Sequence, residues 1–218
     1  MQVVGILNTK GGSGKTTLAT CLAVRAAQDG KVGVIDLDPQ SSYSEWHARR
    51  TLGQDDPNPN LLLGEDRASD AVEAMRLTSP YDYLLVDGAT NALLVTEDAV
   101  RSSDLVIIPM KASTLDLAAS QDCISFCQDL GKPFLVVLND KGQHDGKLVE
   151  QASELLVSWN VPIAKTAIAH RVAYVNAVTT GRTGPEKDKK AAEEINRLWG
   201  EITAALRKGR KTKARRAS

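Results

Sequence analysis

The stretch N-T-K-G-G-S-G-K-T-T at residues 8–17 decides the fold of this chain. Residues 3–7 before it are apolar and predict a buried strand, and residues 18–27 after it have the spacing and the strong helix formers of a helix. A strand, a glycine-rich turn and a helix in this order are typical of a loop that binds phosphate. Glycines let the backbone approach a ligand, and the N–H groups at the start of the helix point at the anion. The stretch therefore predicts a nucleotide phosphate loop.

The polar residues of the loop have separate expected roles. Lys15 would bring a mobile charge to the β- and γ-phosphates, and Thr16 would offer its hydroxyl to Mg²⁺. The alternative is a glycine-rich turn with incidental lysines, which the strand–turn–helix context disfavours. The residues that we expect to bind the phosphates are Gly11, Gly12, Ser13, Gly14, Lys15, Thr16 and Thr17.

The loop departs from the ordinary G-x-x-x-x-G-K-[ST] pattern at one position. Thr9 stands where the pattern needs glycine, and a second lysine, Lys10, precedes Lys15 by five residues. The resulting K-G-G-S-G-K-T-T resembles the deviant Walker A box of the ParA/MinD superfamily of ATPases. This resemblance implies ATP and Mg²⁺ as cofactors and a homodimer in which Lys10 contacts the ATP of the other subunit. The alternative for Lys10 is a solvated loop lysine.

Two acidic segments follow the loop. In V-I-D-L-D-P-Q at residues 34–40, Asp36 and Asp38 leave a predicted strand on the same side. The segment is similar to the second acidic box of the family, and the resemblance implies that Asp38 orients the attacking water and Asp36 holds the water shell of Mg²⁺. The alternative is a turn that caps the next helix. Residues 81–88 have the form of a Walker B strand, in which Asp87 would hold Mg²⁺ through water beside Thr16.

The strand at residues 134–140 ends in Asn139 and Asp140. In the family a polar residue at the matching strand end contacts adenine, so the resemblance makes Asn139 the candidate; plain turn chemistry is the alternative. Gly88-Ala89-Thr90 replaces the two prolines that many members have after the Walker B aspartate. This form looks like the short, ParF-type partition ATPases.

The remaining pattern predicts an α/β fold with a mostly parallel twisted sheet, helices on both faces and nucleotide at the strand carboxyl ends. We expect one ATPase domain at residues 1–206 and a basic, flexible tail at residues 207–218. Further strands are predicted at residues 31–35, 61–63 and 105–110, with an edge strand at 166–168. Further helices are predicted from Ser41 or Ser42 through Arg50 and at residues 67–77, 114–130, 151–159 and 186–207, the last with an apolar stripe.

The charge of the chain is unevenly distributed. The formal net charge is zero, but residues 207–218 carry seven Lys or Arg and no acid, which leaves 20 basic against 27 acidic residues elsewhere. A basic tail suggests a polyanion such as DNA, although a solvated end would look the same. The residues that we expect at a DNA surface are Arg171, Lys189, Lys190, Arg207, Lys208, Arg210 and Lys211.

The resemblance implies a partition or positioning ATPase, weak unless stimulated. It would bind non-specific DNA as an ATP dimer and let go after hydrolysis stimulated by a ParB- or ParG-like adaptor, segregating a plasmid or spacing another cargo. We expect it in the cytoplasm on the nucleoid, without a membrane partner or room for a helix-turn-helix. One alternative is a MinD-like membrane-cycling regulator, which the absence of bulky apolar residues after Leu206 disfavours.

Two enzymes of other classes are weaker alternatives. A small-molecule ligase or kinase, such as dethiobiotin synthetase, has a related loop but needs a substrate pocket that the sequence does not show. An electron-transfer protein like nitrogenase reductase needs cluster cysteines on loops. Cys123 and Cys127 instead share one predicted helix, where core packing is the simpler explanation.

Overall fold

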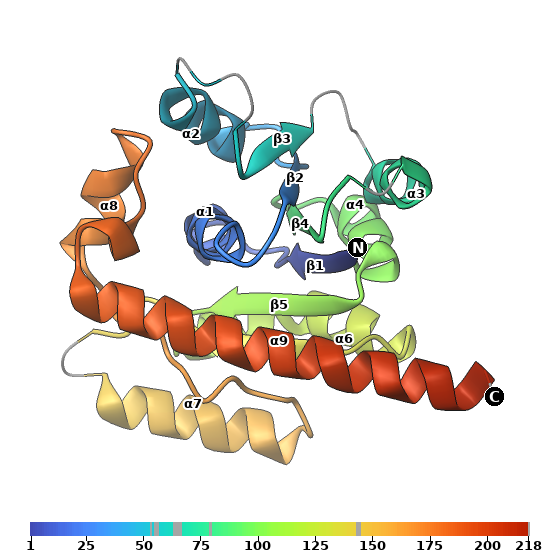
Figure 1. Cartoon of the computed structure of the whole chain (residues 1–218). Helices are drawn as coiled ribbons and strands as arrows, with labels where there is room; N and C mark the ends of the chain where they lie inside the picture. Colours follow the sequence, from blue (N-terminus) through green and yellow to red (C-terminus); the bar gives the residue numbers. More distant parts are fainter. Residues whose placement is uncertain (53, 55–56, 63–66, 79, 143–144, 218) are drawn as a thin grey trace.

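The computed structural model describes residues 1–52, 54, 57–62, 67–78, 80–142 and 145–217, with side chains described as far as residue 210. Its centre is a parallel sheet of six strands in the order β3-β2-β4-β1-β5-β6 (Figure 1). The strands are β1 (Gln2–Ile6), β2 (Val32–Asp36), β3 (Asn60–Leu62), β4 (Tyr83–Asp87), β5 (Leu105–Met110) and β6 (Phe134–Leu138).

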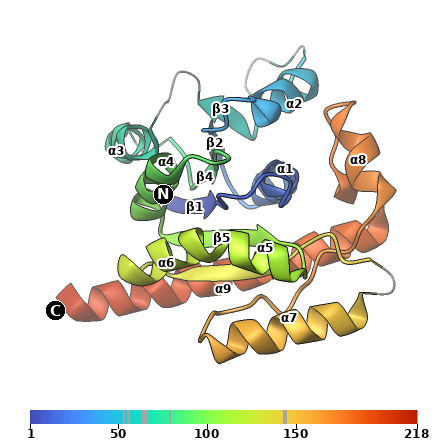
Figure 2. The ribbon, with the colours of Figure 1, turned by 180° about the vertical axis from the view of Figure 1, so that it is seen from behind.

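Helices cover both faces of this sheet, as the sequence predicts (Figures 1 and 2). They are α1 (Lys15–Ala26), α2 (Ser42–Arg50), α3 (Ala68–Thr78), α4 (Leu93–Ser102), α5 (Thr114–Ala119), α6 (Gln121–Asp129), α7 (Gly146–Ser158), α8 (Val172–Val178), the 3-10 turn η1 (Gly184–Glu186) and α9 (Lys189–Ala217). Side chains of α1, α2, α8 and α9 pack on one face, and side chains of α3 to α7 pack on the other.

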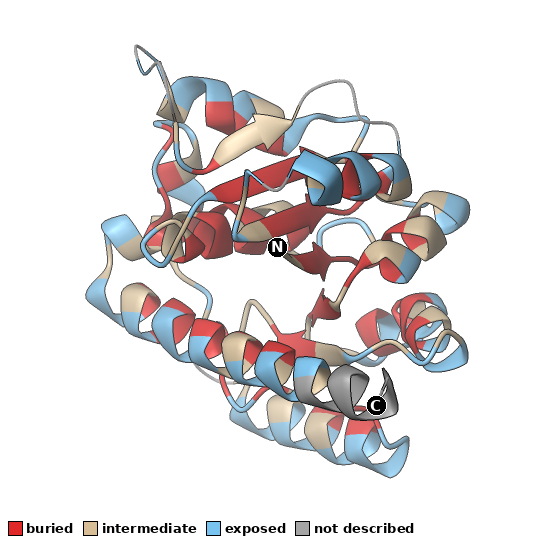
Figure 3. Ribbon diagram, turned by 45° about the vertical axis from the view of Figure 1, so that its right-hand side comes forward, coloured by how far each residue is buried: buried red, intermediate tan, exposed pale blue. Residues whose placement is uncertain are grey.

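Alternation along the strands builds the two cores. In β1, Val4 and Ile6 face the α1 and α9 side, whereas Val3 and Leu7 just beyond the strand face the α3 and α4 side. Because helices cover both faces, most residues of β1, β2, β4, β5 and β6 are buried and appear red in Figure 3, whereas the edge strand β3 is intermediate and appears tan. The predicted apolar stripe of the last helix is confirmed: Ile195, Leu198, Trp199, Ile202 and Leu206 are all at most 3% exposed.

Three expected elements differ in the structure. The helix predicted at residues 114–130 is divided at Ser120, whose hydroxyl donates back to the Asp116 carbonyl and so bends the chain. The expected edge strand at residues 166–168 is wrong; isolated bridges form at Ile163 and Ala169 only. Ile168 still donates its backbone N–H to the Leu138 carbonyl. Between the two bridges, however, Glu201 accepts hydrogen bonds from the backbone N–H groups of Lys165 and Thr166, which interrupts the ladder.

The last helix is longer than expected. α9 continues through most of the basic segment to Ala217, beyond the expected domain boundary at residue 206. The two-part division of the chain therefore stays a prediction. No helix among the described residues is long and apolar enough to cross a membrane.

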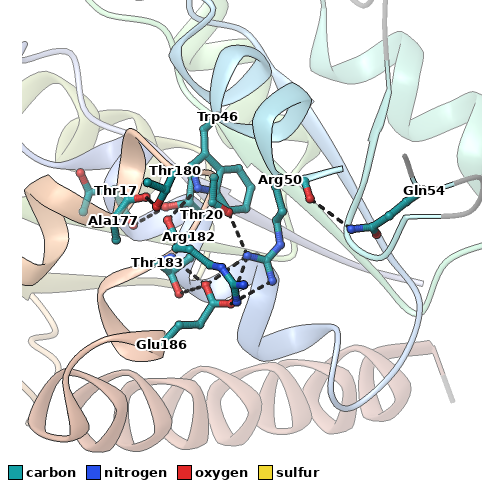
Figure 4. A network of polar contacts seen from close by, with 11 residues as sticks. Thr17, Thr20, Trp46, Arg50, Gln54, Ala177, Thr180, Arg182, Thr183 and Glu186 are labelled. Atoms are coloured by element: carbon teal, nitrogen blue, oxygen red, sulfur yellow. Dashed lines mark hydrogen bonds and ion pairs between the residues drawn. The ribbon is translucent and has the colours of Figure 1, made fainter. Parts of the chain in front are cut away.

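A network of polar contacts ties α2 to the segment before α9 (Figure 4). Arg50 donates to the Gly181 carbonyl at 3.1 Å and pairs with Glu186 at 3.1 Å. The Trp46 indole N–H donates to the Arg182 carbonyl at 2.9 Å. Gly181 has φ 65°, and a Cβ there would lie 2.5 Å from the Arg50 nitrogen, so only glycine fits this crossing. The helix that follows the second acidic segment is thus anchored to η1.

Candidate nucleotide-binding site

The glycine-rich loop connects β1 to the first turn of α1, as expected. Gly12 and Gly14 have φ 72° and 94°, values that L side chains rarely adopt. A Cβ on Gly14 would lie 2.0 Å from the Asn139 amide nitrogen, so any other residue here would have to displace the Asn139 side chain. The Ser13 hydroxyl is buried without a hydrogen-bond partner in the described part of the chain. These features fit a loop whose polar groups are arranged to bind an anion.

Lys15 lies at the start of α1 and is 5% exposed. Its ammonium donates to the Lys10 carbonyl at 3.0 Å and to the Thr90 hydroxyl at 3.1 Å. Burial lowers the pKa of Lys15, and the nearby Asp87 and Asp38 carboxylates oppose that effect. The ammonium is therefore held inside the loop, where a phosphate oxygen could replace the neutral acceptors.

The two carboxylates of the second acidic segment have different surroundings. Asp36 at the end of β2 accepts hydrogen bonds from the backbone N–H and the hydroxyl of Ser44 at 2.9 and 2.7 Å. Asp38 accepts from the Gln40 N–H at 2.9 Å and from the Thr90 hydroxyl at 3.1 Å. The alternative helix-capping role is thus partly realised by Asp36, through Ser44 in α2. Asp38 instead belongs to the chain of contacts that leads through Thr90 to Lys15.

Asp87 ends β4 directly beside Asp36, its partner in the parallel register. It is 0% exposed, and neither carboxylate oxygen has a hydrogen bond among the described residues. Burial raises the pKa of Asp87 to about 8, although the Thr16 hydroxyl and the Lys15 ammonium act in the opposite direction. A buried carboxylate with unpaired oxygens is a favourable place for a divalent cation.

The residues expected at the metal therefore fit Mg²⁺. Asp87 lies near the Thr16 hydroxyl, and Asp36 adjoins Asp87 across the sheet. The described residues contain no group of three or more His, Cys, Asp or Glu side chains that could hold a metal alone. Magnesium would accordingly take its remaining ligands from phosphate and water, as it commonly does.

A pocket of about 250 Å³ adjoins the loop and suits the rest of a nucleotide. Its wall includes Gly12, Gly14 and Thr17 from the loop and Asn139 from the end of β6. The Asn139 amide donates to the Ser13 carbonyl at 2.9 Å, which fixes the side chain against the loop. The pocket thus brings the candidate for the adenine contact next to the phosphate loop, while its contact with a base stays a prediction.

Lys10 forms an ion pair within its own chain. Its ammonium lies 2.6 Å from Asp116 Oδ1, on α5. The Lys10 side chain is 31% exposed and that of Asp116 is 9% exposed. Lys10 is therefore neither a purely solvated lysine nor a ligand of its own loop.

The candidate DNA residues fall on different surfaces. Lys190 and Arg171 line a cleft of about 970 Å³ between α9 and residues 165–171, and Arg171 pairs there with Glu194 at 2.5 Å. Lys208 and Arg210 line another cleft, of about 810 Å³, at the amino ends of β1, β5 and β6. Lys189 and Arg207 are exposed, and the Lys211 side chain lies outside the described part.

Sequence reasoning missed Thr90 and Asp116. Thr90 lies three residues after the Walker B aspartate, but nothing in its local pattern points to Lys15 and Asp38. Asp116 lies three residues after Ser113, whose hydroxyl caps α5 by accepting from the Asp116 N–H. The sequence offers one signal for Asp116, an acidic residue near the start of a predicted helix. Such residues are common, so the signal does not indicate a contact with Lys10.

The loop, the buried aspartate and the parallel sheet define a P-loop nucleotide-binding protein. Residues 4–184 match the family described as the CobQ/CobB/MinD/ParA nucleotide binding domain, and the chain belongs to this family. The resemblance to the ParA/MinD superfamily is thereby confirmed.

Similar proteins match this chain over nearly its whole length. The "Maintenance of carboxysome distribution protein A" of Halothiobacillus neapolitanus is 29% identical over 209 residues, covering 91% of this chain and 95% of that protein. Its namesake from Gloeobacter kilaueensis is 37% identical over 219 residues, with the same coverage. The structure of apo McdA from Cyanothece has a TM-score of 0.73 at 19% identity, covering 94% of this chain and 99% of that one.

Proposed function

We propose that the chain is a positioning ATPase that dimerises with ATP and Mg²⁺, binds non-specific DNA in that state and is released by hydrolysis. The observation that carries the proposal is Lys10, a second lysine in the phosphate loop whose ammonium pairs with Asp116 on α5. Because the Lys10 ammonium makes no hydrogen bond to its own phosphate loop among the described residues, it could contact the nucleotide of a second subunit. Dimerisation through two bound nucleotides would make assembly depend on the γ-phosphate.

The site supports hydrolysis of ATP. Bound Mg²⁺ would neutralise charge on the phosphates and polarise the γ-phosphate. Lys15 would bind the phosphates, and Asp38, held by the Thr90 hydroxyl, would orient the attacking water. We expect basal turnover to be slow and to be stimulated by an adaptor protein, as the resemblance implies.

The cargo that we propose is a protein organelle. The two relatives reported above carry a name that concerns carboxysome distribution and match over 91% of this chain. Plasmid segregation through a ParB- or ParG-like adaptor is the other cargo compatible with the family. The adaptor would in either case link the DNA-bound dimer to the cargo and place the protein on the nucleoid.

The cleft between α9 and residues 165–171 is the DNA surface that we propose. Lys141, Lys165, Lys190 and Arg197 line it, and the structure gives none of the four an ion-pair partner within the described residues. The two carboxylates of the cleft, Glu194 and Glu201, are instead occupied by hydrogen bonds from residues 165–171. Four cations for which the described residues show no ion-pair partner, along one cleft, would provide phosphate contacts without base readout.

A DNA retention experiment tests this function. Binding of a non-specific duplex is measured with ATP, ADP and no nucleotide for the wild type and Lys10→Ala. We expect binding that requires ATP, falls with salt and is lost in the variant. A Lys190→Glu/Arg197→Glu variant should lower the salt slope by about one for each lost phosphate contact.

Lys147→Glu on the exposed surface of α7 is the matched control and should bind DNA like the wild type. Equal binding in all nucleotide states would mean that the basic residues attract DNA by charge alone and that nucleotide does not control binding. No DNA binding, together with ATP-dependent flotation on liposomes, would favour the membrane-cycling alternative.

A further inference from the structure

The ion pair of Lys10 has a rigid acceptor. Asp116 Oδ1 lies 2.6 Å from the Lys10 ammonium, and the other carboxylate oxygen contacts the Ser113 hydroxyl. The Asp116 backbone N–H in turn donates to that hydroxyl at 3.1 Å. Both oxygens of this nearly buried carboxylate are therefore used, and its charge is balanced by Lys10 alone among the described cations within ion-pair distance.

The helix that carries Asp116 is fixed to the chain just before Lys10. The Thr9 hydroxyl donates to the Ala119 carbonyl at 3.0 Å, and the Asn8 amide donates to the Ser120 hydroxyl at 2.8 Å. The Asn8 side chain also accepts from the Lys10 N–H at 2.9 Å. The two backbones cannot separate without losing these bonds. The Lys10 side chain is consequently the mobile member of the pair.

We propose that Asp116 is a positioning residue that holds Lys10 within its own chain and opposes its transfer to the nucleotide of a second chain. This inference rests on the proposed ATP-dependent dimer. When Lys10 leaves, the Asp116 carboxylate, which is only 9% exposed in the pair, loses the cation that balances its charge, which is unfavourable. Breaking this ion pair is therefore a free-energy cost of dimerisation, which the contacts between the two chains must outweigh.

Two exposed leucines, one of them next to Asp116 in the sequence, are compatible with a second chain that closes over the pair. Leu115, beside Asp116, is 78% exposed, and Leu94, near the start of α4, is 82% exposed. Closure would bury such side chains while Lys10 changes partner.

The test compares Asp116→Asn with the wild type. Sedimentation velocity gives the protein concentration at half-dimerisation with a non-hydrolysable ATP analogue and with ADP. We expect half-dimerisation of Asp116→Asn at a concentration lower by about three- to tenfold, the scale of the two partly exposed ion pairs, one in each chain, that dimerisation would break. Asp122→Asn, an exposed acid on the neighbouring helix, is the matched control for charge and should resemble the wild type.

A second readout does not need the dimer. The rate at which an amine-specific acetylating reagent modifies Lys10 is followed by peptide mass spectrometry without nucleotide. Release from Asp116 should raise this rate several-fold in Asp116→Asn and leave the rate at Lys147 unchanged. If the asparagine variant has a low melting temperature, Asp116→Ala provides the same comparison. The alanine variant keeps the helix cap, because Ser113 accepts from the backbone N–H of residue 116 and not from its side chain.

The outcomes separate this inference from the proposed function. In a Lys10→Ala background, Asp116→Asn should no longer change dimerisation, because the lysine it holds is absent. Unchanged or weaker dimerisation of Asp116→Asn beside a wild type that dimerises with the analogue would overturn the positioning role alone. A wild type that stays monomeric with the analogue, while Lys10 acetylation does not respond to Asp116→Asn, would overturn both.

Discussion

The Thr90 hydroxyl donates a hydrogen bond of 3.1 Å to Asp38 Oδ2, across 52 residues of sequence. The same hydroxyl accepts from the Lys15 ammonium at 3.1 Å. Thr90 therefore orients the proposed water-binding carboxylate and the phosphate lysine with a single side chain. A threonine can do this because its hydroxyl donates once and accepts at the same time.

Replacing Thr90 with valine should slow hydrolysis while keeping nucleotide affinity. Asp38 would retain only its bond from the Gln40 N–H, and its carboxylate could rotate away from the water. We expect kcat to fall by about tenfold, a part of the roughly 10²–10⁴-fold that a positioned acid–base group contributes. Steady-state phosphate release measures kcat, and titration with a fluorescent ATP analogue measures affinity.

Thr96→Val is the control for this substitution. Thr96 is 1% exposed, and its hydroxyl has no hydrogen-bond partner among the described residues, so its loss should leave kcat unchanged. Equal effects of the two variants would mean that Thr90 acts through packing and not through Asp38.

The buried Asp87 makes the stability of the nucleotide-free protein depend on pH. Its pKa is raised to about 8 in the fold from an ordinary value of 3.8, so the folded protein holds a proton that the unfolded chain has lost. The stabilising contribution is complete below the unfolded pKa and is lost as pH rises through about 8. The wild type should thus become less stable relative to Asp87→Asn as the pH rises from about 4 to about 8.

Thermal melts of both proteins without nucleotide measure this difference. At the alkaline end, Asp87→Asn should be more stable by at least about 1 kcal/mol, or roughly 2–4 °C in Tm for a chain of this length. Mg²⁺ with ATP should reverse the order, since only the wild type offers the carboxylate. If the Tm values of the two proteins change in parallel with pH, the pKa of Asp87 is not raised in the fold.

The two glycines of the loop should respond differently to alanine. Both have positive φ and would pay about 1–3 kcal/mol of backbone strain. A Cβ on Gly12 meets nothing within 4 Å, whereas a Cβ on Gly14 meets the Asn139 amide at 2.0 Å. Gly14→Ala should therefore unfold at a clearly lower denaturant concentration than Gly12→Ala.

Adding Asn139→Ala to Gly14→Ala removes the atom that clashes. Chemical denaturation of the nucleotide-free variants should then show part of the lost stability returning, in spite of the second substitution. If the double variant is less stable than either single variant by their sum, the two residues act independently and the clash is not the cause.

Local pattern predicted most of the fold because each strand and helix has a face that must be buried. The loop, Asp36 and Asp87 were predictable since they adjoin strand ends, and parallel strands end at one edge. The contact of Thr90 with Lys15 and that of Asp116 with Lys10 join residues 75 and 106 positions apart. Such contacts depend on how elements pack, which periodicity does not encode. The lost edge strand has the same origin, a long-range contact from Glu201.

The anchor of α2 on η1 should depend on Arg50 and not on its neighbour Arg49. Arg50 pairs with Glu186, donates to the Gly181 carbonyl and lies 5.3 Å from the centre of the Trp46 ring (Figure 4). Its removal leaves Glu186 with fewer donors, so Arg50→Ala should cost about 2 kcal/mol, or roughly 4–8 °C in Tm.

Arg49→Ala is the matched control on the same helix. Arg49 pairs with Glu45 across one turn, with side chains 46% and 64% exposed, and such pairs contribute about 0.3–0.5 kcal/mol. Thermal melts at low and high salt separate the two cases, because screening weakens the exposed pair more than the half-buried one. Equal losses of stability in both variants would show that charge on the surface of α2, and not its contact with η1, holds the helix in place.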